Sequence, residues 1–411
     1  MGILLYFKLT KKDAQTISEH INSFERYSRH NIISWNILWG PIPYNLKYDF
    51  LILHYSIPPD HYNYPFWMTD YLTDETKGHE VIKIAFFQDE YNHCKERFKF
   101  IEESDISIVF SLLRDSEHKK VYFDNTNVKK VKTTLAGYVD KSLIKKSKSY
   151  SKKNKNRYID VGYRARPLPF YMGLGAQEKT NIGIKFLNLA KEKNINLDIK
   201  LGEEDRLYGK DWNRFLASCK SMLGVEAGVS IFDIDGSIRE ETEKYIKINP
   251  NADFMEVHEN LLKSNEDNIH YRMLSPRIFE AVAFKTLLIL FEGEYSKLLE
   301  PGVHYLELKK DFSNLEDVLI RLADQKEVNK ITDKAFNDLI QSGKYSYKNF
   351  INEFDSFIDS EIRKSSMIFN KDKFNFKVYR LYKKISFRLN ENYKMFKIAI
   401  KSYLIKKGLY G

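Results

Sequence analysis

Short apolar runs alternate with amphipathic stretches along most of the chain. In the first half the runs are ILLYFK (3–8), YDFLILHYS (48–56), IKIAFFQDE (82–90), ISIVFSLL (106–113) and TLAGYVD (134–140). The stretches between them, such as 12–27 and 92–102, place apolar residues every three or four positions, as on one face of a helix. Continuous apolar runs separated by helices are typical of parallel strands that are buried on both faces.

The second half repeats this scheme. Its apolar runs are RYIDVGY (157–163), NLDIKLG (196–202), KSMLGVE (220–226), TLLILFEG (286–293) and HYLELKKD (304–311). The expected helices cover 179–193, 209–218, 276–284 and 315–342. This pattern predicts an α/β fold with two Rossmann-like domains, each built on a doubly wound parallel sheet. Since ligands bind at the carboxyl ends of such strands, we expect the two domains to face a cleft.

The net charge of +10 is concentrated in two segments outside the predicted sheets. The segment KKSKSYSKKNKNR has 7 basic residues and no acidic residue, and 363–411 has 14 Lys and Arg against Asp372 and Glu391. The rest of the chain is therefore acidic, which argues against a nucleic-acid-binding face on either domain. We expect a first domain over 1–144, a basic linker over 145–157, a second domain over 158–360 and a basic helical tail over 361–411.

Other features of the sequence favour a cytoplasmic protein. Cys94 and Cys219 are its only cysteines, which gives neither a disulfide framework nor a zinc-binding spacing. The N-terminal MGILLYFKLTKK is interpreted as a first strand rather than a signal peptide. No apolar run reaches the roughly 20 residues that are needed to span a bilayer.

The tail has an amphipathic helical pattern with two interpretations. Phe374, Val378, Tyr382 and Ile385 begin a series of apolar residues that recur every three or four positions, with Lys and Arg between them. One interpretation is a helix packed on the domains. The other is a helix that docks on an anionic membrane surface at the inner face of the cell membrane, where each basic residue contributes about 1 kcal/mol.

The stretch VSIFDIDGSI (229–238) suggests phosphate chemistry. Its Asp233-x-Asp235-Gly resembles the first motif of haloacid-dehalogenase phosphatases, and Asp-x-Asp is also a metal-binding signature of one glycosyltransferase fold. The chain has no later Gly-Asp-x-x-x-Asp or Asp-Asp, and Asp233 lies well inside its domain. We therefore predict a strand and turn that lead into an inserted helical segment at about 233–274, and no metal site. A Mg²⁺-dependent phosphatase using Asp233 and Asp235 stays as an alternative.

A better anion site is predicted at residues 275–280. Ser275 and Pro276 are suited to start a helix, and Arg277 and Glu280, three apart, share a face of its first turn. The free backbone N–H groups of a helix start and a guanidinium both bind phosphate oxygens. Glu280 could accept hydrogen bonds from a ribose diol. These residue types together suit a nucleoside diphosphate.

The segment 275–319 resembles the nucleotide-sugar-binding domain of GT-B glycosyltransferases. It contains Pro-Arg-x-Phe-Glu-Ala before a strand, then a Gly-x-Tyr-Ser turn, then HYLELKKDFSNL. The pattern is similar to glycosyltransferase family 4, also called group 1, and to spore-coat-maturation-like proteins. The similarity extends back through LGVEAGVSIFDIDG (223–236), DVGYRARPLPFYMGLGAQEKTNIG (160–183) and IAFFQDEY (84–91), and covers most of the chain from Asp49 to Phe357.

The resemblance implies transfer of a sugar from a nucleoside diphosphate sugar to a glycan, lipid-linked glycan or protein. It implies a hexosyltransferase of cell-surface polysaccharide or glycoconjugate synthesis, with GT-B architecture and no metal or other cofactor. An alternative is a non-catalytic, sugar-nucleotide-binding protein of envelope assembly, because a fold does not determine function.

The resemblance also implies roles for single residues. Family 4 enzymes carry two Glu residues eight positions apart, and Glu280 matches the second, which binds the donor ribose. Arg272 stands at the first position, so we consider Glu226 as its replacement in catalysis. The basic residues expected on the donor diphosphate are Arg164, Arg166 and Lys179. On the acceptor side, Asp89 and His54 follow apolar strands of the first domain, where either could orient or deprotonate an acceptor hydroxyl.

Overall fold

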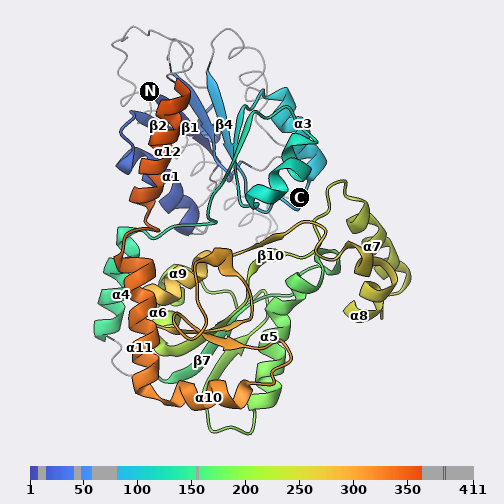
Figure 1. Ribbon diagram of the computed structural model, residues 1–411, viewed down its shortest axis with the longest axis vertical. Helices are drawn as coiled ribbons and strands as arrows, with labels where there is room; N and C mark the ends of the chain where they lie inside the picture. The colour runs from blue at the N-terminus through green and yellow to red at the C-terminus, as the bar shows by residue number, and fades with distance from the viewer. Residues whose placement is uncertain are drawn as a thin grey trace, which may run out of the picture.

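The computed structural model describes residues 1–7, 15–40, 48–57, 81–153, 157–362, 383 and 385. These residues form two α/β domains, each with a parallel sheet covered by helices (Figure 1). The expected fold class, with two doubly wound, Rossmann-like sheets in a GT-B arrangement, is confirmed. The expected amphipathic tail over 361–411 lies almost entirely outside the described residues.

The first sheet has the strand order β2-β1-β3-β4-β5-β6. Four expected strands are confirmed, whereas 134–140 forms no strand and β2 and β6 were not predicted. β6 has a half-exposed, Lys-rich sequence, so no apolar run marks it. The bounds of the elements are β1 (Gly2–Tyr6), α1 (Gln15–Tyr27), β2 (Ile32–Asn36), β3 (Phe50–Leu53), β4 (Ile82–Phe86), α3 (Cys94–Glu103), β5 (Ile108–Ser111) and β6 (Lys130–Thr133).

The second sheet has the order β13-β12-β9-β7-β8, so both sheets start with the same 2-1-3 arrangement of strands. All five expected strands are confirmed. The expected helix over 315–342 is divided, because Asp324 ends α10 and accepts hydrogen bonds from the first amides of α11. The bounds are β7 (Ile159–Arg164), α5 (Leu174–Ala190), β8 (Leu197–Lys200), α6 (Gly209–Ser218), β9 (Cys219–Gly224), α9 (Pro276–Ala283), β12 (Leu287–Phe291), β13 (Leu306–Leu308), α10 (Leu315–Ala323) and α11 (Gln325–Ala335).

Short helical turns connect these elements. They are η1 (Ile37–Trp39), η4 (Asp115–Glu117), η5 (Lys119–Phe123), η6 (Phe170–Met172), η7 (His258–Leu262), η8 (Lys263–Asn265), η9 (Tyr295–Lys297) and η10 (Phe336–Gln341).

The chain crosses between the domains twice. The first crossing leads into α4 (Lys141–Lys153), a helix that occupies most of the expected linker. The second leads into α12 (Tyr347–Ile362), which returns to the first domain and lies beside α1 (Figure 1). The two crossings pair where the Val139 N–H donates to the Tyr345 carbonyl, 2.8 Å away. The last helix of the expected second domain therefore covers the first sheet.

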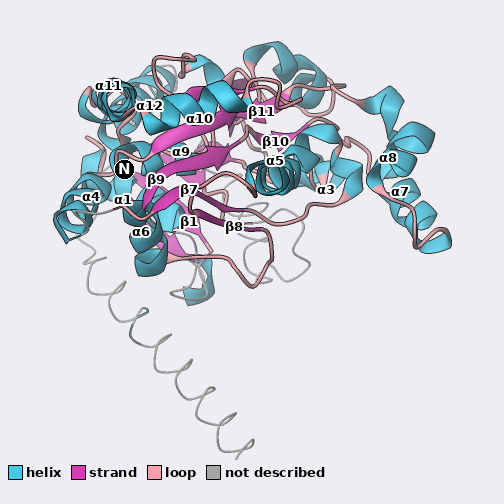
Figure 2. Cartoon of the chain, turned by 90° about the horizontal axis from the view of Figure 1, so that it is seen from below, coloured by secondary structure: helices cyan, strands magenta, loops and turns pink. Residues whose placement is uncertain are grey.

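An insertion interrupts the second domain between two short antiparallel strands, β10 (Ala227–Val229) and β11 (Tyr271–Met273). It contains α7 (Ser237–Ile248) and α8 (Phe254–Val257), which project beyond the rest of the molecule (Figure 2). The Asp233 carboxylate accepts hydrogen bonds from the amides of Gly236 and Arg239, both at 2.9 Å. Only Val229 of VSIFDIDGSI lies in a strand, β10, so the expected strand over this stretch is wrong. The expected turn into an inserted helical segment is present, because the residues around Asp233 lead into α7.

No group of three or more His, Cys, Asp or Glu residues in the described part of the chain is placed to hold a metal ion. No helix there is both long enough and apolar enough to cross a membrane.

Candidate functional site

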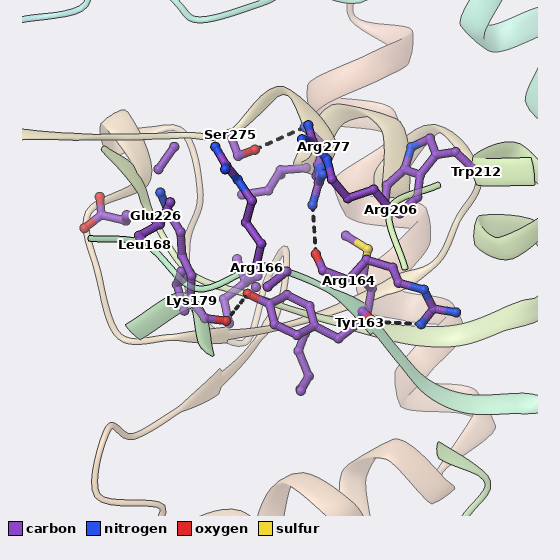
Figure 3. Close-up of a pocket in the computed structure, with 18 of the residues that line it drawn as sticks. Tyr163, Arg164, Arg166, Leu168, Lys179, Arg206, Trp212, Glu226, Ser275 and Arg277 are labelled. Atoms are coloured by element: carbon purple, nitrogen blue, oxygen red, sulfur yellow. Dashed lines mark hydrogen bonds between the residues drawn. The ribbon is translucent and has the colours of Figure 1, made fainter. Parts of the chain in front are cut away.

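A cavity of about 310 Å³ opens at the carboxyl ends of β7 and β9 (Figure 3). This is the point where the strand order of the second sheet reverses, which is where doubly wound sheets bind ligands. Asp89 and Tyr91, which follow β4 of the first domain, also line it. The cavity is therefore shared by the two domains. Its positively charged lining residues are Arg164, Arg166, Lys179, Arg206 and Arg277.

The start of α9 places Arg277 in the cavity. Ser275 is the N-cap of this helix, and its hydroxyl accepts a hydrogen bond from the Arg277 amide at 3.4 Å. The Arg277 side chain donates to the Arg164 carbonyl at 2.8 Å and lies over the Trp212 ring, 5.2 Å from its centre (Figure 3). Arg277 is exposed, so an anion can reach its remaining N–H groups.

Glu280 holds the Trp212 ring on which Arg277 lies. Its Oε2 accepts a hydrogen bond from Trp212 Nε1 at 2.7 Å, and Glu280 itself is absent from the cavity lining. Burial raises the pKa of its carboxyl to about 7. In this structure Glu280 therefore orients the aromatic wall formed by Trp212, and its expected contact with a donor ribose stays a prediction.

Lys179 approaches the cavity from α5. Its Nζ donates to the Gly228 carbonyl at 3.4 Å. Burial lowers the pKa of this ammonium to about 8; Asp89 opposes the shift, and Arg272 and Arg277 add to it. Lys179 and Arg277 have carbonyl partners but no ion pair among the described residues. Both can therefore bind an anion without losing an existing salt bridge.

Arg166 and Arg206 share one acidic partner at the edge of the cavity. The Arg166 guanidinium lies 3.4 Å from Glu203 Oε2, and the Arg206 guanidinium lies 2.5 Å from Glu203 Oε1. Sequence reasoning missed Arg206 and Trp212. Arg206 lies in the loop between β8 and α6, and Trp212 lies in the first turn of α6. A search for polar residues after every strand would therefore have found Arg206.

The Arg164 side chain is already occupied. Its guanidinium pairs with Asp198 at 2.8 Å and lies 4.3 Å from the centre of the Phe215 ring. Its main chain, in contrast, supplies the carbonyl that holds Arg277. Arg164 thus positions Arg277 through its main chain, and its expected contact with the diphosphate stays a prediction.

Glu226 lines the cavity and belongs to a buried ion-pair network. Its Oε1 accepts a hydrogen bond from the Tyr295 amide at 2.8 Å, and its Oε2 lies 3.4 Å from Arg272 Nε. Arg272 also pairs with Glu178, which binds Lys310. The sequence analysis considered Glu226 as the replacement for the glutamate that is absent at position 272. In the structure Arg272 and Glu226 form an ion pair with each other.

The two expected acceptor-side residues differ in position. Asp89 is exposed, lines the cavity and has a left-handed backbone with φ 50°. His54 is 1% exposed, does not line the cavity and contacts Ser56 through Nδ1 at 2.9 Å. Burial, and then the nearby His20, lower the pKa of His54. The expectation for His54 is corrected: this side chain is packed inside the first domain, away from the cavity lining.

Comparisons with known proteins found similar solved structures only. No family model matches the sequence, and no curated protein matches it. HepE from Anabaena, solved with UDP, has a TM-score of 0.46 and 10% identity over 87% of this chain and 99% of its own. Sucrose-phosphate synthase from Thermosynechococcus elongatus has a TM-score of 0.43 and 10% identity over 88% of this chain and 89% of its own. TarM has a TM-score of 0.42 and 13% identity over 75% of this chain and 54% of its own.

Proposed function

We propose that the chain is a glycosyltransferase that moves a hexosyl group from a nucleoside diphosphate sugar to an acceptor hydroxyl. The observation that carries this proposal is the position of Lys179 and Arg277. They have no ion pair among the described residues, and they lie where the strand order reverses, next to the N-terminus of α9. Helix starts and unpaired cations bind phosphate groups. Each such contact contributes about 1.5 to 3 kcal/mol.

The charge of the cavity suits a diphosphate. Arg166 and Arg206 share Glu203, which leaves one net positive charge between them. Lys179 and Arg277 add two more, and Asp89 removes one. The resulting balance matches the two negative charges of a diphosphate diester better than the single charge of a phosphate diester.

The ends of the cavity suggest how the donor lies. Trp212 and Glu226 are at opposite ends, with the cations between them (Figure 3). We place the nucleoside toward the aromatic wall of Trp212 and the sugar toward Glu226, whose carboxylate can accept hydrogen bonds from sugar hydroxyls. Asp89 would then orient or deprotonate the acceptor from the first domain. The acceptor class is a glycan, lipid-linked glycan or protein, in cell-surface polysaccharide or glycoconjugate synthesis.

In this proposal the reaction needs no metal ion. The departing nucleoside diphosphate would be stabilised by Lys179, Arg277 and the positive end of the α9 dipole. EDTA should therefore leave transfer intact.

A ligand panel tests the proposal. Nucleotide sugars with different bases and sugars should raise the melting temperature selectively, because a ligand at 100 times its Kd adds about 2.7 kcal/mol. Arg277→Ala should weaken the binding of a nucleoside diphosphate far more than the binding of the bare nucleoside, because the proposed partner of Arg277 is phosphate. Arg214→Ala is the matched control, because this exposed arginine of α6 pairs only with Asp211 in the described structure. Equal losses for both ligands in Arg277→Ala would place the diphosphate elsewhere.

The two alternatives make different predictions. A phosphatase would need a free carboxylate at Asp233, but both of its oxygens hold backbone amides of the α7 start. Asp233→Asn should accordingly leave sugar transfer intact. If the wild type released phosphate in a Mg²⁺-dependent reaction and Asp233→Asn abolished it, the phosphatase interpretation would be restored. A non-catalytic binding protein would bind a nucleotide sugar but show neither transfer nor donor hydrolysis.

We further propose peripheral attachment to an anionic membrane through the basic tail. Since α12 extends to Ile362, truncation after this residue preserves the first domain. The truncated chain should sediment less with anionic liposomes than the full chain. Equal sedimentation would exclude the tail as the attachment.

A further inference from the structure

The β10–β11 hairpin belongs to the second half of the chain but is buried against the first domain. Val229, Tyr271 and Met273 of the hairpin, with Phe232 and Ile269 beside it, join one apolar core with Phe87 and Phe98. Tyr271 is 1% exposed. The hairpin therefore forms a second attachment between the domains, separate from the paired crossings at Val139 and Tyr345.

At this attachment the Tyr271 hydroxyl fixes a turn of the first domain. It accepts a hydrogen bond from the Glu90 amide at 3.1 Å and lies 3.3 Å from Glu90 Oε2. The neighbours of Glu90 in sequence, Asp89 and Tyr91, both line the cavity. The Tyr91 and Tyr271 rings also meet edge to face, 5.6 Å apart. The orientation of Asp89 thus depends on a contact from the other domain.

The same hairpin holds the donor side of the cavity. Lys179 binds the Gly228 carbonyl of β10, and Arg272 of β11 pairs with Glu226. Neighbouring residues of the hairpin, Gly228, Arg272 and Tyr271, therefore contact the candidate diphosphate-binding lysine, the candidate sugar-binding glutamate and the turn that carries Asp89.

We propose that the β10–β11 hairpin sets the acceptor-side turn against the donor pocket, and that Tyr271 is a positioning residue for Asp89. This inference rests on the proposed function. Tyr271 touches neither substrate: it acts through the Glu90 amide. Its loss should consequently affect turnover rather than donor affinity.

The test compares Tyr271→Phe with Tyr122→Phe. Each variant removes one tyrosine hydroxyl that hydrogen-bonds to the buried Glu90. Tyr122 belongs to the first domain, and its hydroxyl binds the Glu90 carboxylate rather than the Glu90 amide. Tyr271→Phe should speed hydrogen exchange at the Glu90 amide and lower kcat about tenfold, the rate equivalent of one buried hydrogen bond. The Kd of a nucleotide sugar should change less than about twofold. Tyr122→Phe should leave both the exchange of this amide and kcat near the wild-type values.

A double-mutant cycle with Asp89→Asn separates positioning from general stability. If Tyr271 acts through Asp89, Tyr271→Phe should cause no further loss of kcat in the Asp89→Asn background. Equal kcat for Tyr271→Phe and wild type, or losses that add in the double variant, would overturn the inference while the proposed function stands. Absence of turnover by the wild-type chain with every nucleotide sugar would instead overturn the proposed function itself.

Discussion

Two arginines of the cavity show that a side chain's partners, rather than its type, determine what it can bind. Arg164 and Arg277 lie next to each other, joined by the hydrogen bond from the Arg277 side chain to the Arg164 carbonyl. Asp198 neutralises Arg164, whereas Arg277 has an aromatic ring and a carbonyl as its partners. Of these two arginines, Arg277 keeps its positive charge for a ligand, which supports its predicted role at the donor diphosphate.

Lys179 predicts a pH dependence of donor binding. Its pKa of about 8 means that it is charged at neutral pH and loses its proton as the pH rises through 8. Only the charged form attracts a diphosphate. The Kd of a nucleotide sugar, whose diphosphate does not titrate here, should thus be constant near pH 7 and rise above pH 8, by up to about tenfold per unit. Titration calorimetry across this range measures it.

Two variants of Lys179 serve as controls for this pH dependence. Lys179→Arg keeps the charge at every accessible pH, so its Kd should show no step at pH 8. Lys179→Met should bind the nucleotide sugar weakly at every pH in this range. A wild-type Kd that does not change between pH 7 and 10 would contradict the assignment of Lys179 to the diphosphate.

Neutralising the Glu280 carboxylate should stabilise the fold. Its folded-state pKa of about 7 lies above its usual value of 4.5, so the folded chain holds the proton more tightly. Stability therefore falls as the pH rises from about 4.5 to 7, and the whole cost is present above 7. Glu280→Gln is always neutral and keeps an acceptor for Trp212. Its melting temperature should exceed that of the wild type by roughly 2–4 °C near pH 8, but not near pH 4.5.

Scanning calorimetry at the two pH values tests this. Glu280→Ala, which also removes the acceptor for Trp212 Nε1, should be less stable than Glu280→Gln at both values. A lower melting temperature for Glu280→Gln than for the wild type near pH 8 would show that the carboxylate form is preferred in the fold.

At the scale of single elements, continuous apolar runs predict most of the strands, although the buried strand β2 was missed. The run TLLILFEG corresponds to β12, which is buried at every position, so nothing but a central strand fits it. The edge strand β6 and the three-residue strands β10 and β11 have no continuous apolar run. Their formation depends on partners far away in the sequence, which a local pattern does not contain.

The sequence predicted only part of the candidate site. Asp89, Glu226 and Arg277 line the cavity, because each follows a strand or starts a helix at a sheet's carboxyl edge. His54 also follows a strand, yet it is enclosed by His20 and Tyr55. Whether a residue after a strand faces the cleft or the interior depends on tertiary packing, and local sequence does not determine it.

Gly228 tests the importance of the β10–β11 hairpin. Its φ is +98°, and an added Cβ would lie 1.9 Å from the Tyr271 carbonyl oxygen, which is backbone and cannot move aside cheaply. Gly228→Ala should cost more than about 2 kcal/mol, because it combines backbone strain with a clash inside the hairpin. Urea unfolding measures this loss.

Gly236, the N-cap of α7, is the matched control outside the hairpin. Its φ is +82°, but an added Cβ would meet nothing within 4 Å. Gly236→Ala should cost only the backbone strain of about 1 to 2 kcal/mol. Equal losses in the two variants would mean that the close pairing of Gly228 with β11 adds nothing.

In the whole molecule, two features join the domains into one unit. The return of α12 means that the first sheet is completed by the last described helix of the chain, which contributes Tyr347, Phe350, Ile351, Phe354 and Ile358 to its core. The hairpin places second-domain residues such as Tyr271 and Phe232 in the other core of the first domain. Neither face of the first sheet is therefore covered by the first domain's own sequence alone.

Phe354 tests this mutual dependence. It is 1% exposed, and its ring lies 5.2 Å from that of Phe24 and 5.6 Å from that of Phe110, centre to centre. Phe354→Ala should destabilise the chain by about 3 to 5 kcal/mol through lost burial and the cavity that remains. Phe123→Ala, at a position that is 45% exposed, should have little effect. Because the cores of the domains interpenetrate, calorimetry should show one unfolding transition, and Phe354→Ala should shift all of it to lower temperature. Two transitions, only one of which moves, would mean that the domains unfold independently and that the hairpin contact contributes little to their cohesion.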